Sequence, residues 1–308
     1  MNTDFPAKRH HMNESVKGYI FSVLASLLVS LAFIFNAVAL REGINPETGS
    51  LFIFLFATMG SLAMVIASGK LGGLAHAYRN YTKPMALMGV INGIASIAWF
   101  YSLSLLGPSL LGFLLTFSTL FIIALSVTFL KERFNFLEGA GGAITFAGAL
   151  IITHSSSAIT SGAVFALVSS VLFSISQIIS KIYVKRIPAL YMNNIRSFFM
   201  LATITIYGLL TNSFQVPSPT ALLLVLAAAV SGPVLSFYLH FRSMEIADLS
   251  KITLIRSLDP LVIVILSAFL LGETLKDTQL AGGIVVVFGI VLIGLARYRP
   301  KMIAKWVP

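Results

Sequence analysis

The chain has 308 residues, of which 57% are hydrophobic and only 10% are charged. A soluble domain carries about 25% charged residues, so this composition excludes a soluble globular protein and predicts an integral membrane protein. The 21 Lys and Arg residues outnumber the 11 acidic residues and give a net charge of +10. Most of them lie between the apolar runs or at the chain ends, and they form no cluster on a soluble domain, so we expect no nucleic-acid partner.

Ten apolar runs follow one another along the chain, each close to the roughly 20 residues that a membrane-spanning helix needs. Helices are predicted because they satisfy their own backbone hydrogen bonds in lipid. The connections are short, so no soluble domain is inserted. The first run is too long for the apolar core of a cleaved signal peptide, which has about 7–15 residues. The runs cover residues 18–40, 48–68, 84–106, 109–130, 136–154, 160–182, 189–211, 218–241, 249–271 and 277–296.

The basic residues predict how these helices are oriented, because short cytoplasmic loops are enriched in Lys and Arg. The two ends and every second connection hold seventeen of the 21 basic residues, whereas the other connections hold only Arg41 and Lys276. We therefore expect a protein of the cell (inner) membrane with both ends in the cytoplasm. Residues 1–17 and the basic residues 297–308 are the predicted tails, and the basic side chains contact lipid head groups.

The two halves of the chain resemble each other at a fixed offset of 141 residues. The run Ala-Gly-Gly at 140–142 recurs at 281–283, and Glu132 aligns with Glu273. Other apolar and glycine positions agree at the same offset from the first helix pair to the last. An ungapped offset that persists over this length indicates an internal duplication.

Each half, 18–154 and 160–296, holds five predicted helices. Because five is an odd number, the second half must enter the membrane from the opposite side. The predicted fold is therefore an all-α integral membrane protein with ten transmembrane helices, arranged as two inverted five-helix repeats. This architecture is common among secondary transporters.

The duplicated layout, the Asp259-Pro260 turn and the Leu-Gly-Glu-Thr helix end at 271–274 resemble the drug/metabolite transporter superfamily, specifically its EamA-type members. The resemblance covers about residues 18–296. It implies a central cavity between the halves, lined largely by helices 1, 3, 4, 6, 8 and 9, that opens alternately to each side. It also implies a small-molecule substrate, commonly moved outward and commonly driven by the proton gradient. The first half departs from the pattern, with Ser118-Thr119 in place of Asp259-Pro260.

Three charged residues inside the predicted spans are candidates for substrate binding. Arg256 and Asp259 are three residues apart, so they share a helix face near the bilayer centre, where a charge costs about 2.5–3.5 kcal/mol. Arg196 lies at a similar depth in the seventh run. Such residues usually face a pathway. Arg256 would hold a carboxylate or phosphate, and Asp259 an amine or a coupling proton. If Arg196 also faces inward, the cavity is net positive and suits an anionic or zwitterionic substrate. The alternatives are a structural Arg256–Asp259 pair and an Arg196 that extends toward the head groups.

Four uncharged residues are further candidates for contact with the substrate. Asn36 and Gln177 occupy equivalent places in the two halves and could hydrogen-bond a substrate, although polar residues also hold membrane helices together. Tyr101 and Tyr238 could stack on a flat substrate, and their alternative is simple packing or the aromatic belt at the membrane interface.

Two prolines and two glutamates have predicted mechanical roles. Pro260 removes a backbone donor within the ninth run, and Pro233 within the eighth, so both are predicted hinges. Glu132 and Glu273 precede the fifth and tenth runs and are predicted to act as helix caps or gate contacts. The Ala-Gly-Gly runs should let the fifth and tenth helices approach closely, and they would also suit a homodimer contact.

Signatures of enzymes are missing from the sequence, which has no Gly-rich phosphate loop, no His-Glu-x-x-His motif and no cysteine. We therefore predict a secondary transporter without cofactor, metal or catalytic residues, which moves an amino-acid-like zwitterion or an organic anion. The alternatives are an uptake or exchange carrier for a larger anion such as a nucleotide-like or vitamin compound, a non-transporting receptor, and a membrane-embedded lipid enzyme.

Overall fold

The computed structural model describes residues 5–130, 136–153, 157–247, 252, 255–256 and 258–298, and within these residues the secondary structure is helical, without strands. This agrees with the all-α prediction. The elements in chain order are α1 (Phe5–Arg41), α2 (Pro46–Ala67), α3 (Leu71–Leu115), α4 (Phe117–Leu130), α5 (Phe136–Thr153), α6 (Ser157–Tyr183), α7 (Ala189–Thr211), α8 (Pro219–Ala229), the π-helix η1 (Val230–Ser236), α9 (Phe237–Ile246), α11 (Asp259–Leu271) and α12 (Asp277–Tyr298).

Seven stretches of the described residues are long and apolar enough to cross a membrane. One of them, Leu71–Leu125, has 55 residues and holds two predicted runs. Inside it, Gly107 adopts a φ of 75°, a left-handed conformation that favours glycine, and Pro108 follows. Of two shorter apolar helices, Phe136–Ile152 lies in the fifth run and Asp259–Leu271 covers the latter part of the ninth. The number of ten membrane crossings therefore stays a prediction, and these helices are compatible with it.

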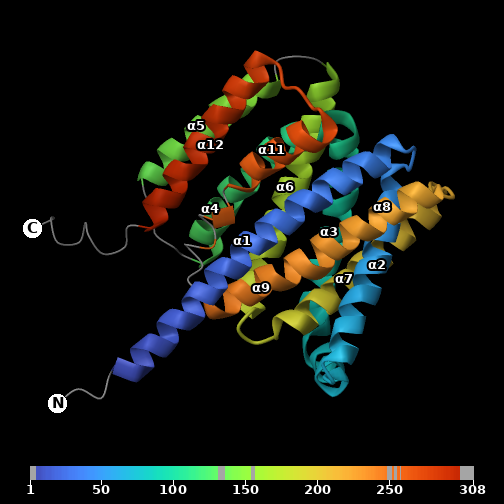
Figure 1. The fold of residues 1–308 in the computed structure, drawn as a ribbon, viewed down its shortest axis with the longest axis vertical. Coiled ribbons are helices and arrows are strands. Elements are labelled where there is room, and N and C mark those ends of the chain that lie inside the picture. Colours follow the sequence, from blue (N-terminus) through green and yellow to red (C-terminus); the bar gives the residue numbers. More distant parts are fainter. Residues whose placement is uncertain are drawn as a thin grey trace, which may run out of the picture.

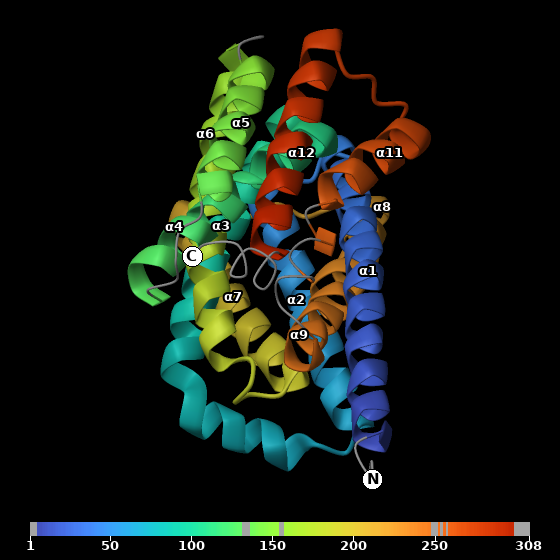
Figure 2. The ribbon, with the colours of Figure 1, turned by 90° about the vertical axis from the view of Figure 1, so that its left-hand side faces the viewer.

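The predicted connection at 69–83 is largely helical, which the sequence prediction missed. Helix α3 begins at Leu71 and contains Pro84. Figure 2 shows its first turns running across one end of the bundle before the helix turns into it. Similarly, α1 begins at Phe5, inside the predicted tail, and extends beyond the bundle in Figure 1. Residues 1–4 and 299–308 of the predicted tails, and Glu132, lie outside the described residues.

Side chains of the connecting segments determine where two of the helices begin. The side chain of Asn45 accepts a hydrogen bond from the Thr48 amide at 2.9 Å, and Ser218 accepts one from the Ala221 amide at 3.1 Å. A proline follows each of these caps, where its missing N–H costs nothing. Helices α2 and α8 therefore start at positions set by local sequence.

Helices α5 and α12 form a pair at one end of the molecule, away from α2, α7 and α9 (Figures 1 and 2). Four glycines bring their backbones together. A Cβ at Gly148 would lie 2.7 Å from the Gly282 oxygen, and one at Gly141 would lie 2.6 Å from the Gly289 oxygen. Because 141 meets 289 while 148 meets 282, the two helices run antiparallel. The close approach predicted for these glycines is present within one chain.

The remaining helices pack in a reciprocal pattern. Helix α1 packs against α8, η1 and α9, and α3 packs against α6; likewise α4 packs against α6, and α11 against α1. All of these contacts join one half to the other. At the 141-residue offset, the contact of α1 with α8, η1 and α9 corresponds to that of α6 with α3, and the contact of α4 with α6 corresponds to that of α11 with α1. Helices α2 and α7, which are equivalent to each other, also pack together. This arrangement places segments of both halves around the molecule's centre.

Candidate functional site

A cavity of about 850 Å³ lies at the centre of the bundle. This volume is within the range of small-molecule sites, about 300–1,000 Å³. Its walls come mainly from α1, α2, α3, α4, α6, α7, η1, α9 and α11, with single residues from α5 and α12. Seven of the nine predicted site and hinge residues line it: Asn36, Gln177, Arg196, Pro233, Arg256, Asp259 and Pro260.

The two predicted tyrosines are not among the residues that line this cavity. Tyr101 donates a hydrogen bond to Glu47 and stacks on Phe165, with ring centroids 5.2 Å apart. Tyr238 packs against a separate cluster of buried side chains that includes Met192. Their role in substrate binding stays a prediction, without support from this geometry.

Arg256 and Asp259 form an ion pair with 2.9 Å between Nη2 and Oδ2. Both side chains are mostly buried, with 22% and 16% exposed. Asp259 begins helix α11 and Pro260 lies in its first turn, so the proline stands at a helix start and not in the middle of a continuous helix. Residues 249–251, 253–254 and 257 of the predicted ninth run lie outside the described residues.

The ion pair leaves hydrogen-bonding capacity unused. Asp259 Oδ1 and Arg256 Nη1 are buried and have no hydrogen-bond partner. The Ser26 hydroxyl of α1 lies beside the Asp259 carboxylate without a hydrogen bond of normal geometry. Buried polar atoms are rarely left unpaired, so these atoms are available to a molecule that enters the cavity.

Arg196 on α7 is buried, with 2% of the residue exposed, so it does not extend to the membrane surface. Its guanidinium lies 4.1 Å from the centroid of the Phe237 ring. One terminal nitrogen contacts Asn193 Oδ1 at 3.3 Å, the other contacts the Met200 sulfur at 3.4 Å, and Nε has no partner. No acidic side chain among the described residues forms an ion pair with it.

Pro233 lies inside η1, a π-helix of seven residues between α8 and α9. Such π-helical turns occur frequently at functional sites. The Asn193 side chain donates hydrogen bonds to the carbonyl oxygens of Pro233 at 2.8 Å and Val234 at 3.2 Å. These bonds connect the side chain of α7 to the backbone of η1. Asn193 thereby connects the predicted hinge to Arg196.

The structure adds lining residues that sequence reasoning did not select for the site. His240 is buried at the cavity and its Nδ1 has no hydrogen-bond partner. Glu138 and Lys181 line the cavity from the start of α5 and the end of α6. A charge at the end of an apolar run is ordinarily explained by its position near the membrane surface, so these two residues were not predicted to line a cavity. The described residues contain no group of side chains suited to a metal ion.

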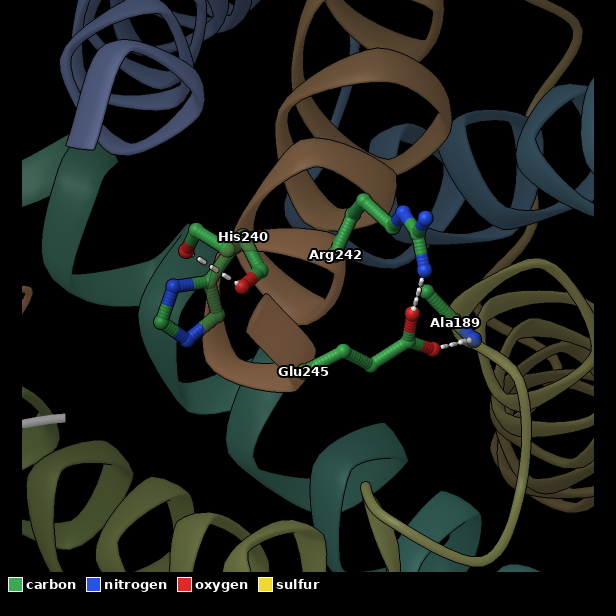
Figure 3. Close-up of polar contacts among 5 residues, drawn as sticks. Ala189, His240, Arg242 and Glu245 are labelled. Carbon is green, nitrogen blue, oxygen red and sulfur yellow. Dashed lines mark hydrogen bonds and ion pairs between the residues drawn. The ribbon is translucent and has the colours of Figure 1, made fainter. Parts of the chain in front are cut away.

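Polar contacts fasten the bundle at both of its ends. At one end, the Ser109 hydroxyl donates to Glu273 Oε2 at 2.8 Å, and a Cβ on Gly107 would lie 2.7 Å from Oε1. Glu273, a predicted cap or gate contact, therefore sits on the kink of α3. At the other end, Glu245 accepts from Arg242 and from the Ala189 amide at the start of α7. Figure 3 shows these groups on one side of α9 and His240 on the other.

Comparison with known proteins gives two matches of different kinds. The sequence model of the EamA-like transporter family matches residues 16–154 and 160–295. A solved structure titled "Crystal structure of protein" superposes with a TM-score of 0.65 at 19% sequence identity, covering 94% of this chain and 99% of that one. At this identity the likeness shows a shared fold alone. Comparison with curated proteins gives no match.

Proposed function

The chain belongs to the EamA-like transporter family, and from the cavity at its centre we propose that it is a secondary transporter of a small polar metabolite. Membership implies an integral membrane protein with a small-molecule substrate, and the long apolar helices agree with it. The proposed mechanism is alternating access, in which the cavity opens in turn to the two sides of the cell (inner) membrane, with both chain ends in the cytoplasm.

The observation that carries this proposal is the Arg256–Asp259 pair in the cavity wall. Ionisable residues at membrane depth are costly and usually face a substrate or ion pathway. This pair keeps one buried oxygen and one buried N–H group without a protein partner. The cavity also offers amide groups from Asn36 and Gln177. A polar solute that fills these hydrogen bonds is therefore a suitable occupant.

The reciprocal packing supports two inverted repeats, which we propose to be residues 18–154 and 160–296. A two-fold axis in the membrane plane makes equivalent helices antiparallel and makes their contacts reciprocal. The α5–α12 crossing has this property, because Gly141 and Gly148 are equivalent to Gly282 and Gly289 and each pair contacts the other. Two such halves can exchange conformations, which closes one side of the cavity and opens the other.

We propose outward transport coupled to a proton, with Asp259 as the group that takes up the proton. A carboxylate on the pathway with one unpaired oxygen is suited to this role. Protonation would weaken the ion pair with Arg256 and so link proton entry to movement of α11. Uptake of a larger anion by exchange would use the same groups and would appear as flux that requires solute on both sides.

Flux measurements in proteoliposomes test the proposed function. Purified protein is first screened against metabolites by thermal shift, and each compound that stabilises the protein is then assayed for flux with and without a pH gradient. We expect at least one polar metabolite to move faster than in protein-free liposomes, and faster still with the gradient. Binding without flux would contradict transport and indicate a receptor. Turnover in detergent, without a sealed compartment, would indicate an enzyme.

A further inference from the structure

Arg196 lines the cavity, and among the described residues no acidic side chain forms an ion pair with it. Resting on the proposed transport function, we propose that Arg196 forms an anion-binding subsite and that the substrate is an organic monocarboxylate. The carboxylate would supply the negative charge that the described lining of the cavity lacks.

The charges that line the cavity do not cancel. Among the described residues, the basic lining side chains are Lys181, Arg196 and Arg256, and the acidic ones are Glu138 and Asp259. With His240 neutral, one positive charge remains. Asp259 neutralises Arg256 directly at 2.9 Å, whereas no acid pairs with Arg196. A buried charge without a partner is strongly unfavourable, so an anion that enters here gains from pairing with it.

The contacts of the guanidinium leave an edge available to a ligand. Phe237 covers one face at 4.1 Å, and Phe241 lies 5.7 Å from the same carbon. The two protein acceptors are an amide oxygen at 3.3 Å, which is long for an N–H···O bond, and a thioether sulfur at 3.4 Å, which is a weak acceptor; both are uncharged. Nε donates to nothing in the described residues. An arginine edge with free N–H groups matches the two oxygens of a carboxylate.

Residues of two helices hold this edge of the guanidinium in place. Asn193 and Met200 lie one turn on either side of Arg196 on α7, whereas Phe237 begins α9 directly after η1. Asn193 is itself held by the η1 carbonyls. The subsite therefore joins α7 to the π-helical segment, and we assign Asn193 as its positioning residue.

Charge balance distinguishes between classes of anion. A monoanion would bring the net lining charge to zero. A zwitterion would leave one positive charge uncompensated, and a phosphomonoester, with about −1.5 to −2 charges, would overshoot. Aromatic rings beside the polar groups, from Phe33, Trp99 and Phe173 among others, offer an apolar surface for the rest of the molecule. The geometry thus points to a monocarboxylate with an apolar body.

Thermal unfolding with matched probes tests the subsite directly. The probes are aliphatic and aromatic monocarboxylates, including phenylacetate, each measured beside its neutral amide, together with phenethylamine, phenylalanine and inorganic phosphate. We expect at least one carboxylate to stabilise the wild-type protein more than its amide, its amine and phosphate do. Failure of every carboxylate to exceed its amide would overturn the proposal.

Substitutions separate the anion site from a structural role. Arg196→Met should remove the carboxylate-specific shift, and should leave the ligand-free melting temperature unchanged or raised because an unpaired buried charge is lost. Arg196→Lys should weaken carboxylate binding about 10- to 100-fold, since it keeps the charge but not the planar edge. Lys185→Gln, an exposed charge change outside the cavity lining, is the control and should bind as wild type does. Two results together would contradict the subsite. One is a much lower melting temperature of ligand-free Arg196→Met, and the other is wild-type carboxylate affinity in Arg196→Lys.

Flux of the same probes distinguishes this inference from the proposed function. Carboxylate binding that depends on Arg196 without any flux would contradict transport and leave the subsite standing. Flux of amines or neutral solutes at equal rates in wild type and Arg196→Met would leave transport standing and overturn the subsite. Carboxylate flux that falls about 10- to 100-fold in Arg196→Met would support both.

Discussion

The two halves of the chain present different chemistry at equivalent positions of one cavity. Leu115 and Ser118 line it in the first half, whereas Arg256 and Asp259 occupy the corresponding places in the second half. Helix packing, by contrast, is alike in both halves. The fold therefore does not require the charged pair, because the equivalent segment of the first half forms helix and cavity wall without it.

The same contrast recurs on the neighbouring helices. Trp99 of α3 corresponds to His240 of α9, and both line the cavity. Leu55 of α2 corresponds to Arg196 of α7, which brings a further charge to the second half. We infer that the similar packing of the two halves allows the cavity to open to either side, and that the second half provides most of the polar contacts to the substrate. Each prediction below tests one side of that division.

The largest effect should come from the shared packing. Gly148→Leu, or Gly289→Leu at the equivalent position of the other half, would add a side chain where even a Cβ would lie 2.7 or 2.6 Å from a carbonyl oxygen of the opposite helix. Overpacking costs typically 1–3 kcal/mol and more where backbones must separate, so both variants should lose most of the monodisperse protein in detergent. Size-exclusion chromatography with thermal unfolding measures this.

Gly72→Ala is the matched control, because a Cβ there meets nothing within 4 Å. It should purify and melt as the wild-type protein does. If the substitution in one half is harmless while that in the other is severe, the packing is not shared, and the proposed two-fold relation between the halves is wrong.

The charged pair should show the next largest effect. Arg256→Gln removes one partner and leaves the Asp259 carboxylate buried and unpaired, which costs about 3–5 kcal/mol for a buried pair. The double variant Arg256→Gln with Asp259→Asn removes both charges and should recover much of the melting temperature. Flux should stay low in both variants, because the polar groups offered to the solute are gone.

Recovery of flux together with stability in the double variant would show that the pair only fastens α11. That result would assign the pair a structural role and would remove the functional contrast between the halves. Thermal unfolding and proteoliposome flux on the same preparations are sufficient to decide.

The smallest effects on stability should come from two hydrogen bonds at the starts of α2 and α7. These helices are equivalent, but different residues hold their first turns in the two halves. In the first half Tyr101 of α3 donates to Glu47 of α2, and in the second half Glu245 of α9 accepts from the Ala189 amide of α7. Tyr101→Phe and Glu245→Ala should each lower the free energy of unfolding by about 1 kcal/mol, the usual value of one hydrogen bond. Thermal unfolding that moves in only one variant would show that only one half is fastened in this way.

Hydrophobic length was sufficient to predict where the helices lie, because lipid requires long, self-satisfied helices. It was not sufficient for the shape of those helices. Nothing in the apolar pattern distinguishes a π-helical turn at Pro233 from a simple kink, and the helical start of α3 lies in a segment too polar to be predicted as a span. Backbone geometry of this kind depends on contacts between helices.

For the site, intramembrane charge and polarity led directly to Arg196, Arg256 and Asp259, because such residues are costly in lipid. The tyrosines were selected on residue type alone, which cannot tell a ring that lines a cavity from one that packs behind it. Asn193 was visible in the sequence, but its link to the η1 carbonyls required the packing of α7 against η1. His240 was not selected for the site, because depth in the membrane alone does not give the direction in which a side chain points.

One comparison tests the central claim most directly, namely that the charged position of the second half acts on the solute in the cavity. Flux of the best-bound metabolite is measured in proteoliposomes for the wild-type protein, Asp259→Asn and Ser118→Ala at equal protein density. We predict that Asp259→Asn lowers flux about 10- to 100-fold, as the loss of a charge-assisted contact should, while Ser118→Ala changes it less than about twofold. Equal flux in all three, with equal melting temperatures, would contradict this account.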